Sequence, residues 1–100
     1  MIINGKNFTL SHVSKGLIKI NDEVMDYEGY LNFIKPIAHE TTAELAEAVR
    51  TLNDKVMKCD PKDKPRYEAE RKSILKGYYE NQDNLYKFRS IAETMLLSTI

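Results

Sequence analysis

Residues 41–58 read TTAELAEAVRTLNDKVMK, and this stretch decides the fold. Thr41 with Glu44 three residues later forms a capping box, in which each side chain can accept a hydrogen bond from an exposed backbone N–H at a helix start. The apolar residues recur at steps of three and four and so share one helical face: Leu45, Val49, Leu52 and Val56. Ala46 and Ala48 allow close approach of a neighbour. We predict a helix over 41–58 that packs against another helix.

The residues that follow predict an antiparallel neighbour for this helix. Residues 60–65, Asp-Pro-Lys-Asp-Lys-Pro, have the composition of a turn. Pro65, or the residue after it, suits the first turn of a new helix, because a missing N–H costs nothing there. The helical spacing then continues to about Ser98 through a second apolar set, Ile74, Tyr78, Leu85, Phe88, Ala92 and Met95. We predict a long helix over 65–98, antiparallel to 41–58.

The length of this final helix raises the question of what covers it. At about 1.5 Å per residue it would extend roughly 50 Å, well beyond the reach of 41–58. Either an earlier helix or a second protein chain must therefore cover the rest of its apolar face. Residues 95–100, Met-Leu-Leu-Ser-Thr-Ile, stay apolar to the last residue, which favours docking of this end, for instance across a dimer.

Residues 21–38 predict an earlier helix. Asn21 suits the N-cap, and the acidic residues after it lie where carboxylates interact favourably with the helix dipole. The apolar stripe comprises Val24, Tyr27, Leu31, Ile34 and Ala38. Pro36 lacks a backbone N–H and disfavours a helical Lys35, so we expect a break between this helix and 41–58.

Residues 1–20 carry the signals of β-strands. Asn4-Gly5 favours the positive φ angles of a type I′ turn, and a second turn is expected around residues 14–16. Two or three short strands result, and they should lay their apolar face on the helices because an isolated hairpin is only marginally stable. The expected fold is α+β and mostly α: a short N-terminal β-hairpin or meander packed on three helices, the last two forming a long antiparallel hairpin. The 100 residues are expected to form a single domain, 1–100.

The composition narrows the class of protein. Fifteen Lys and Arg balance fifteen Asp and Glu, so the chain lacks the basic excess that draws proteins to nucleic acids or anionic membranes. No apolar stretch approaches the ~20 residues of a membrane span, and the N-terminus lacks the features of a signal peptide. Cys59 is the only cysteine, which excludes an internal disulfide framework. We expect a cytoplasmic protein that binds neither membrane nor nucleic acid.

The residue types that usually carry catalysis do not form a recognisable set. His39-Glu40 begins like the zinc-protease motif, but that motif needs a second His at position 43, where the chain has Ala43. Cys59 lies beside Asp60 near a predicted helix C-terminus, and both features disfavour a thiolate. We expect no catalytic residue and no cofactor.

One set of carboxylates points to an alternative. Glu44 and Glu47 share a side of one predicted helix, and Glu80 and Asp83 share a side of the next. Facing pairs of this kind can hold magnesium, which prefers oxygen ligands in octahedral array. The set resembles the metal motif of the MazG-like all-α nucleotide pyrophosphohydrolases. That resemblance implies an oligomeric, magnesium-dependent hydrolase of nucleoside triphosphates, with these four residues as ligands.

The aromatic residues suggest a binding surface. The final helix carries more tyrosines than one buried stripe can hold, interleaved with basic side chains. Tyrosine is amphipathic and enriched in protein interfaces, and the same surface would suit an anionic nucleotide. The candidate partner-binding residues are Tyr67, Arg71, Tyr79, Tyr86 and Arg89.

These observations favour a small non-enzymatic binding protein that sequesters or inhibits a partner protein through an exposed helical surface. A homodimer or a higher oligomer is compatible with the same surface. The composition, rich in Lys, Asn, Ile and Tyr, is compatible with an accessory protein of a phage or mobile element. Two alternatives remain, an oligomeric nucleotide-binding protein and the MazG-like hydrolase.

Overall fold

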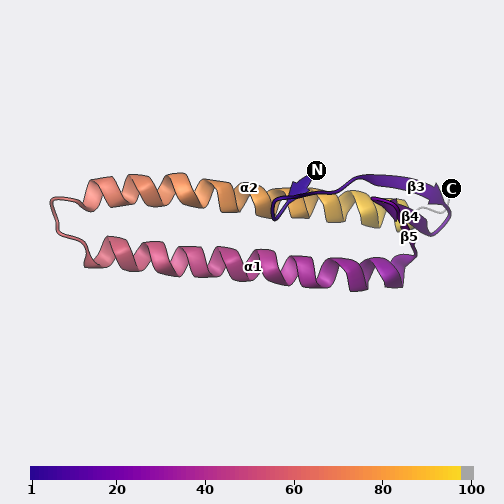
Figure 1. Cartoon of the computed structure of the whole chain (residues 1–100), viewed down its shortest axis with the longest axis horizontal. Helices are drawn as coiled ribbons and strands as arrows, with labels where there is room; N and C mark the ends of the chain where they lie inside the picture. Colours follow the sequence, from indigo (N-terminus) through magenta and orange to yellow (C-terminus); the bar gives the residue numbers. More distant parts are fainter. Residues whose placement is uncertain (98–100) are drawn as a thin grey trace.

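Two long antiparallel helices form the body of the molecule, as the computed structural model of residues 1–97 shows (Figure 1). The molecule is elongated, 60 × 22 × 18 Å, and a short strand layer lies against the end of the hairpin opposite its turn. In chain order the elements are β1 (Ile2–Ile3), β2 (Lys6–Asn7), β3 (Leu10–Ser14), β4 (Leu17–Ile20), β5 (Glu23–Met25), α1 (Tyr27–Lys58) and α2 (Lys64–Leu97). The fold is therefore α+β, with two long helices rather than the expected three.

The strands form two small antiparallel sheets. β1 and β2 pair around Asn4-Gly5, whose φ angles of 53° and 75° confirm the expected positive-φ turn. The second sheet is a meander in the order β3-β4-β5, and Gly16, with φ 74°, lies in its first turn. The strand region thus extends to Met25, five residues beyond the expected 1–20.

The expected helix start at Asn21 is wrong. Asn21 adopts a left-handed φ of 54° in the turn before β5, and its side-chain oxygen accepts a hydrogen bond from the Thr9 backbone N–H at 3.0 Å. Asp26 is the N-cap of α1 instead, since its Oδ1 accepts from the Gly29 N–H at 2.8 Å. Pairing of Val24 with β4 occupies the backbone groups that a helix over 21–25 would have used.

The expected break at Pro36 is also wrong, because α1 continues through it. A proline inside a helix costs about 3 kcal/mol, but the inward-facing positions stay in phase on both sides of it, from Ile34 to Thr41. Burial of this continuous stripe against α2 and the strands outweighs the lost hydrogen bond. Thr41 therefore lies inside the helix, where its hydroxyl donates to the Ile37 carbonyl at 2.8 Å, and the expected capping box with Glu44 does not form.

The final helix closely matches its expected span. α2 begins at Lys64, so Pro65 lies in its first turn, and it extends to Leu97; Ser98, together with Thr99 and Ile100, lies outside the described residues. Of the described residues of 95–100, Leu96 is buried and Met95 packs against the core, whereas Leu97 is 66% exposed. The fused α1 spans 32 residues against 34 in α2. Residues 27–40 of α1 thus cover the part of α2 that a helix over 41–58 alone could not reach.

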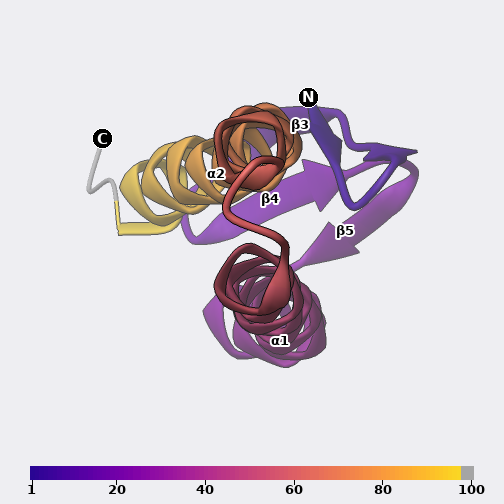
Figure 2. The same cartoon turned by 90° about the vertical axis from the view of Figure 1, so that its left-hand side faces the viewer.

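The main core lies at the end of the hairpin that carries the strands. The strand layer packs on one side of the plane of the two helices, as the view along the hairpin shows (Figure 2). The Phe8 ring lies 5.8 Å from Phe33 on α1 and 5.9 Å from Phe88 on α2, measured between centroids. The buried cluster comprises Ile3, Phe8, Ile18, Ile20, Tyr30, Ile34, Leu85, Phe88, Ala92 and Leu96. Toward the turn, the described buried residues reduce to Leu52 and Val56.

A polar latch fixes the β1–β2 turn midway along the hairpin. The Asn4 backbone N–H donates to Asn81 Oδ1 at 2.7 Å, and Asn81 Nδ2 donates back to Asn4 Oδ1 at 2.7 Å. The Thr41 hydroxyl lies 3.1 Å from the same Asn4 oxygen. The turn therefore bridges α1 and α2, and the strand layer ends there.

Candidate interaction face

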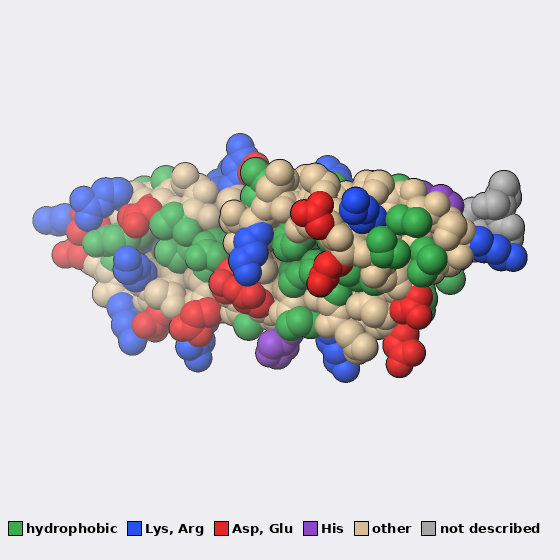
Figure 3. Space-filling view, turned by 45° about the vertical axis from the view of Figure 1, so that its right-hand side comes forward, with side chains coloured by type: hydrophobic (Ala, Val, Ile, Leu, Met, Phe, Trp, Pro, Cys, Tyr) green, Lys and Arg blue, Asp and Glu red, His purple; other side chains and the backbone are tan. Residues whose placement is uncertain are grey.

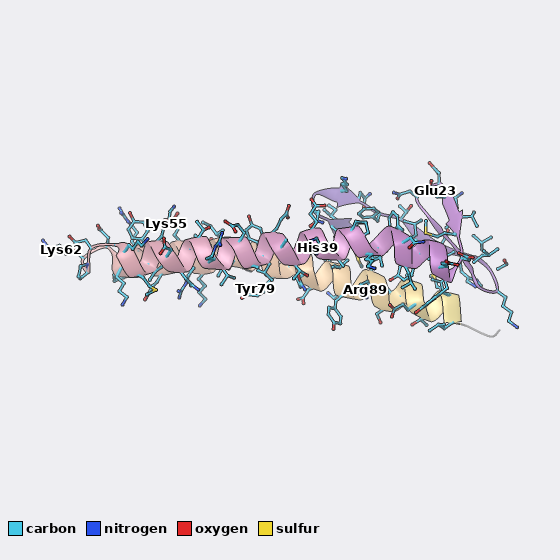
Figure 4. The ribbon with its side chains drawn as sticks, turned by 90° about the horizontal axis from the view of Figure 1, so that it is seen from below. Glu23, His39, Lys55, Lys62, Tyr79 and Arg89 are labelled. Atoms are coloured by element: carbon cyan, nitrogen blue, oxygen red, sulfur yellow. The ribbon has the colours of Figure 1, made fainter. Side chains whose placement is uncertain are left out.

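The strand layer leaves the opposite side of the hairpin uncovered among the described residues. Figure 4 views the molecule from below and places Tyr79 and Arg89 on the side of the helices away from the strands. Residues spaced by about four positions along α2 share this side. We call it the open face and define it by Val49 and Asn53 of α1 with Arg71, Leu75, Tyr79, Asp83, Tyr86 and Arg89 of α2.

A shallow groove runs along the turn-proximal half of the open face. Val49 and Leu75 are half-buried and contribute apolar surface from the two helices. Tyr79 also lines the groove and is 53% exposed. Arg71 donates across the hairpin to the Asn53 side-chain oxygen at 2.9 Å, which restrains both side chains. The groove is therefore an apolar strip with an aromatic side chain available to a partner.

Charged side chains flank this apolar strip. Toward the turn they are mainly basic, with Lys72 and Lys76 beside Arg71, and toward the middle of α2 they are acidic, with Glu80 and Asp83. Within residues 1–97 the two lysines and the two carboxylates form no ion pair with each other or with another residue. The charges thus remain available to a bound molecule.

A second hollow continues the open face toward the strand-bearing end. Tyr86, Arg89, Ser90 and Glu93 line it. Tyr86 is 72% exposed, the most exposed tyrosine of the described chain, whereas Arg89 is half-buried. The face therefore offers two exposed aromatic rings, Tyr79 and Tyr86, two helical turns apart.

Two residues that line this hollow, Arg89 and Glu93, also influence the pKa of Tyr30 in the core. Burial raises the pKa of the Tyr30 hydroxyl, the nearby charge of Glu93 raises it further, and Arg89 opposes the shift. The Tyr30 hydroxyl makes no hydrogen bond of good geometry with residues 1–97. Tyr30 is thus a buried phenol that favours its neutral form.

Ionisation of the Tyr30 hydroxyl is expected to lower the free energy of unfolding at alkaline pH. The pKa of Tyr30 in the folded chain lies above the ordinary value of 10.0. The stability that the neutral hydroxyl contributes is therefore complete below about pH 10 and is lost as the pH rises through the folded-state pKa. Tyr30→Phe should remove this part of the pH dependence. Urea unfolding at a series of alkaline pH values measures it, with the exposed Tyr86→Phe as a control that should keep the wild-type profile. Identical profiles for both variants would contradict the assignment.

The five candidate residues from the sequence do not form one cluster. Arg71 and Tyr79 share the groove, and Tyr86 and Arg89 share the adjoining hollow. Tyr67 lies apart, near the turn, in a separate hollow with Cys59 and the end of α1. The Arg66 guanidinium lies 5.0 Å from the centroid of the Tyr67 ring, a cation–π contact. Four of the five thus belong to the open face.

The structure reveals a further groove on the strand-bearing side, which the sequence did not single out. It begins where the β1–β2 turn ends and runs toward the hairpin turn, with hydrophobic side chains gathered along it (Figure 3). Its lining residues are Ala43, Glu44, Glu47, Ala48, Thr51, Leu52, Ile74 and Tyr78. The small side chains Ala43 and Ala48 were the available signal, because they leave space beside a packed helix.

The two carboxylate pairs lie in different grooves. Glu44 and Glu47 line the groove of the strand-bearing side, whereas Glu80 and Asp83 line the groove of the open face. Glu47 forms an ion pair with Arg50. Within residues 1–97 no group of three or more His, Cys, Asp or Glu side chains is placed to hold a metal ion. The convergence that the resemblance to MazG-like enzymes implies is therefore not found.

Comparison with protein families, curated proteins and solved structures gave no match. Of the helices in the described part of the chain, neither combines the length and apolar character that crossing a membrane requires. The open face therefore has to be interpreted from its own geometry and chemistry.

Proposed function

We propose that this chain is a small non-enzymatic binding protein of the cytoplasm that captures a partner protein on its open face and thereby sequesters or inhibits it. The observation that carries the proposal is the exposure of Tyr79 above an apolar strip that the two helices build together. Exposed aromatic residues with an apolar neighbourhood and a polar rim are typical of protein interfaces.

The rigidity of the hairpin supports the same proposal. Tyr79 and Tyr86 project from one continuous helix, so their spacing is fixed before a partner arrives. The hydrogen bond between Arg71 and Asn53 restrains the rim of the groove. A preorganised surface loses less conformational entropy on binding.

The charges of the groove favour a protein over a nucleotide. Lys72 and Lys76 could contact phosphate groups, but Glu80 and Asp83 line the same groove and would repel them. A protein surface can present both signs of charge at the required positions.

Photo-cross-linking in the cells that naturally express the protein tests the proposal. A photoreactive phenylalanine analogue at position 79 or 86 should yield an adduct with a second, different protein. The same analogue at Val24, an exposed position on β5, serves as the control and should not give that adduct.

Tyr79→Ala is then expected to weaken binding of the cross-linked protein by about tenfold or more, because an aromatic anchor at the centre of an interface carries much of its energy. Isothermal titration calorimetry with the purified pair measures this change, and Val24→Ala provides the matched control. Wild-type affinity in a Tyr79→Ala, Tyr86→Ala double variant would refute the proposed role of the open face.

A further inference from the structure

The charged residues of the open-face groove follow an order along α2. From the turn toward the strands, the α2 residues that line the groove are Glu68, Arg71, Lys72, Leu75, Lys76, Tyr79, Glu80 and Asp83. Leu75 and Tyr79 lie between the basic residues on the turn side and the acidic residues nearer the strands, and Lys76 lies between Leu75 and Tyr79. Apart from Glu68 at the turn-side end and Lys76 at the centre, the order along the helix is therefore basic, apolar, acidic.

This order is self-complementary under a two-fold axis. When two helices run antiparallel, a residue before the axis on one copy lies opposite a residue the same distance after it on the other. An axis midway between Leu75 and Tyr79 places Leu75 of each copy opposite Tyr79 of the other. The same axis places Lys72 opposite residue 82 of the second copy, one position from Asp83.

Two more features of the groove agree with this arrangement. The axis also brings Lys76 to within a helical turn of Glu80 on the second copy, so that both basic residues meet acidic ones. Within one chain, Lys72 and Lys76 are neighbours of like charge one turn apart, an unfavourable pair, and a glutamate lies one turn beyond each of them, Glu68 and Glu80. Among the described residues neither lysine has an ion-pair partner.

We infer that a second copy of the chain occupies the open face of the free protein, with α2 antiparallel to α2 of the second copy. The apolar strips of the two grooves then cover each other, and the pairs of charges close the interface at both ends. This inference rests on the proposed function in one respect, that the open face binds protein. It adds that capture of a different partner requires the two copies to separate.

Charge reversal tests the register of this dimer in the purified protein. Lys72→Glu alone and Asp83→Lys alone each place like charges opposite each other at two sites, so each should raise the dissociation constant of the dimer by about tenfold or more. An equimolar mixture of the two variants should regain an affinity within about threefold of wild type. In the mixed dimer the new glutamate faces the new lysine, and the second site keeps the native Lys72–Asp83 pair. Sedimentation equilibrium over a concentration series measures all four samples.

Two exposed charges outside the open face provide matched controls. Glu44 lies on the strand-bearing side and Lys55 lies near the turn. The variants Glu44→Lys and Lys55→Glu should both dimerise like wild type. Circular dichroism verifies that each variant is folded. A wild-type protein that stays monomeric up to about 1 mM, or a mixture that associates no better than its components, would overturn the inference.

The outcomes separate this inference from the proposed function. If the purified chain is a monomer while position 79 still cross-links to a different protein in cells, the dimer is wrong and the binding function stands. If the mixture restores the dimer but only adducts of twice the chain mass form in cells, the dimer stands and capture of a different partner is wrong.

Discussion

Replacement of Phe88 by alanine is expected to lower the free energy of unfolding by about 3–5 kcal/mol, the usual cost of removing a fully buried phenyl ring. Phe88 is 2% exposed, and its ring meets Phe8 of the strand region at a centroid distance of 5.9 Å. Phe8 in turn packs on Phe33 of α1. The Phe88 ring thus belongs to a chain of three rings that joins α2, the strand region and α1, with Phe8 in the middle. A small domain has only about 5–15 kcal/mol to lose.

Urea denaturation followed by far-ultraviolet circular dichroism measures this loss. Tyr86→Ala is the matched control, because it removes an aromatic ring of similar size from the same helix at a site that is 72% exposed. It should change the free energy of unfolding by less than about 0.5 kcal/mol. Equal losses in the two variants would show that the core is not centred on Phe88.

Asn81→Ala is expected to destabilise the fold by about 1–3 kcal/mol, although alanine is the better helix former. Asn81 exchanges two hydrogen bonds of 2.7 Å with Asn4. Its loss leaves the Asn4 backbone N–H without its acceptor in a partly buried position, and such a group costs more than the bond itself contributed. The β1–β2 turn should then detach from the hairpin.

Hydrogen exchange at the Asn4 amide reports this detachment directly, and urea denaturation gives the accompanying loss of stability. Asn32→Ala, at an exposed asparagine of α1, is the control and should be neutral or slightly stabilising. A protected Asn4 amide in Asn81→Ala, or equal stability changes in the two variants, would contradict the latch.

The helix boundaries show where local signals succeed and fail. The Asn4-Gly5 turn and the start of α2 near Pro65 were predictable, because backbone conformation there depends on neighbouring residues alone. Asn21 and Asp26 are both good N-caps by type, and only the pairing of β5 with β4 decides between them. Pro36 is a helix breaker by propensity, but the burial of residues on both sides of it outweighs that preference.

The candidate site shows the same division. The sequence predicted exposed tyrosines on the final helix, and Tyr79 and Tyr86 are exposed. It could not show that they share a face with Arg71 and Arg89 but not with Tyr67, because that depends on which side of the hairpin the strands cover. The sequence also could not show that the two carboxylate pairs lie in different grooves. Helical spacing determines which residues of one helix are neighbours, but not which side of that helix faces the other helix.

The sequence by itself determined the elements: strand signals at the N-terminus, an apolar stripe at helical spacing through both arms, and a turn around Pro61 that makes them antiparallel. Tertiary structure alone decided that Pro36 lies within one helix and that Asn4 reaches Asn81, which is 77 residues away. It also decided which side of the hairpin remains open. The physical reason is that turns and helical periodicity arise from interactions a few residues apart, whereas burial of a proline-containing helix and docking of the strand layer depend on surfaces that meet only when the chain has folded.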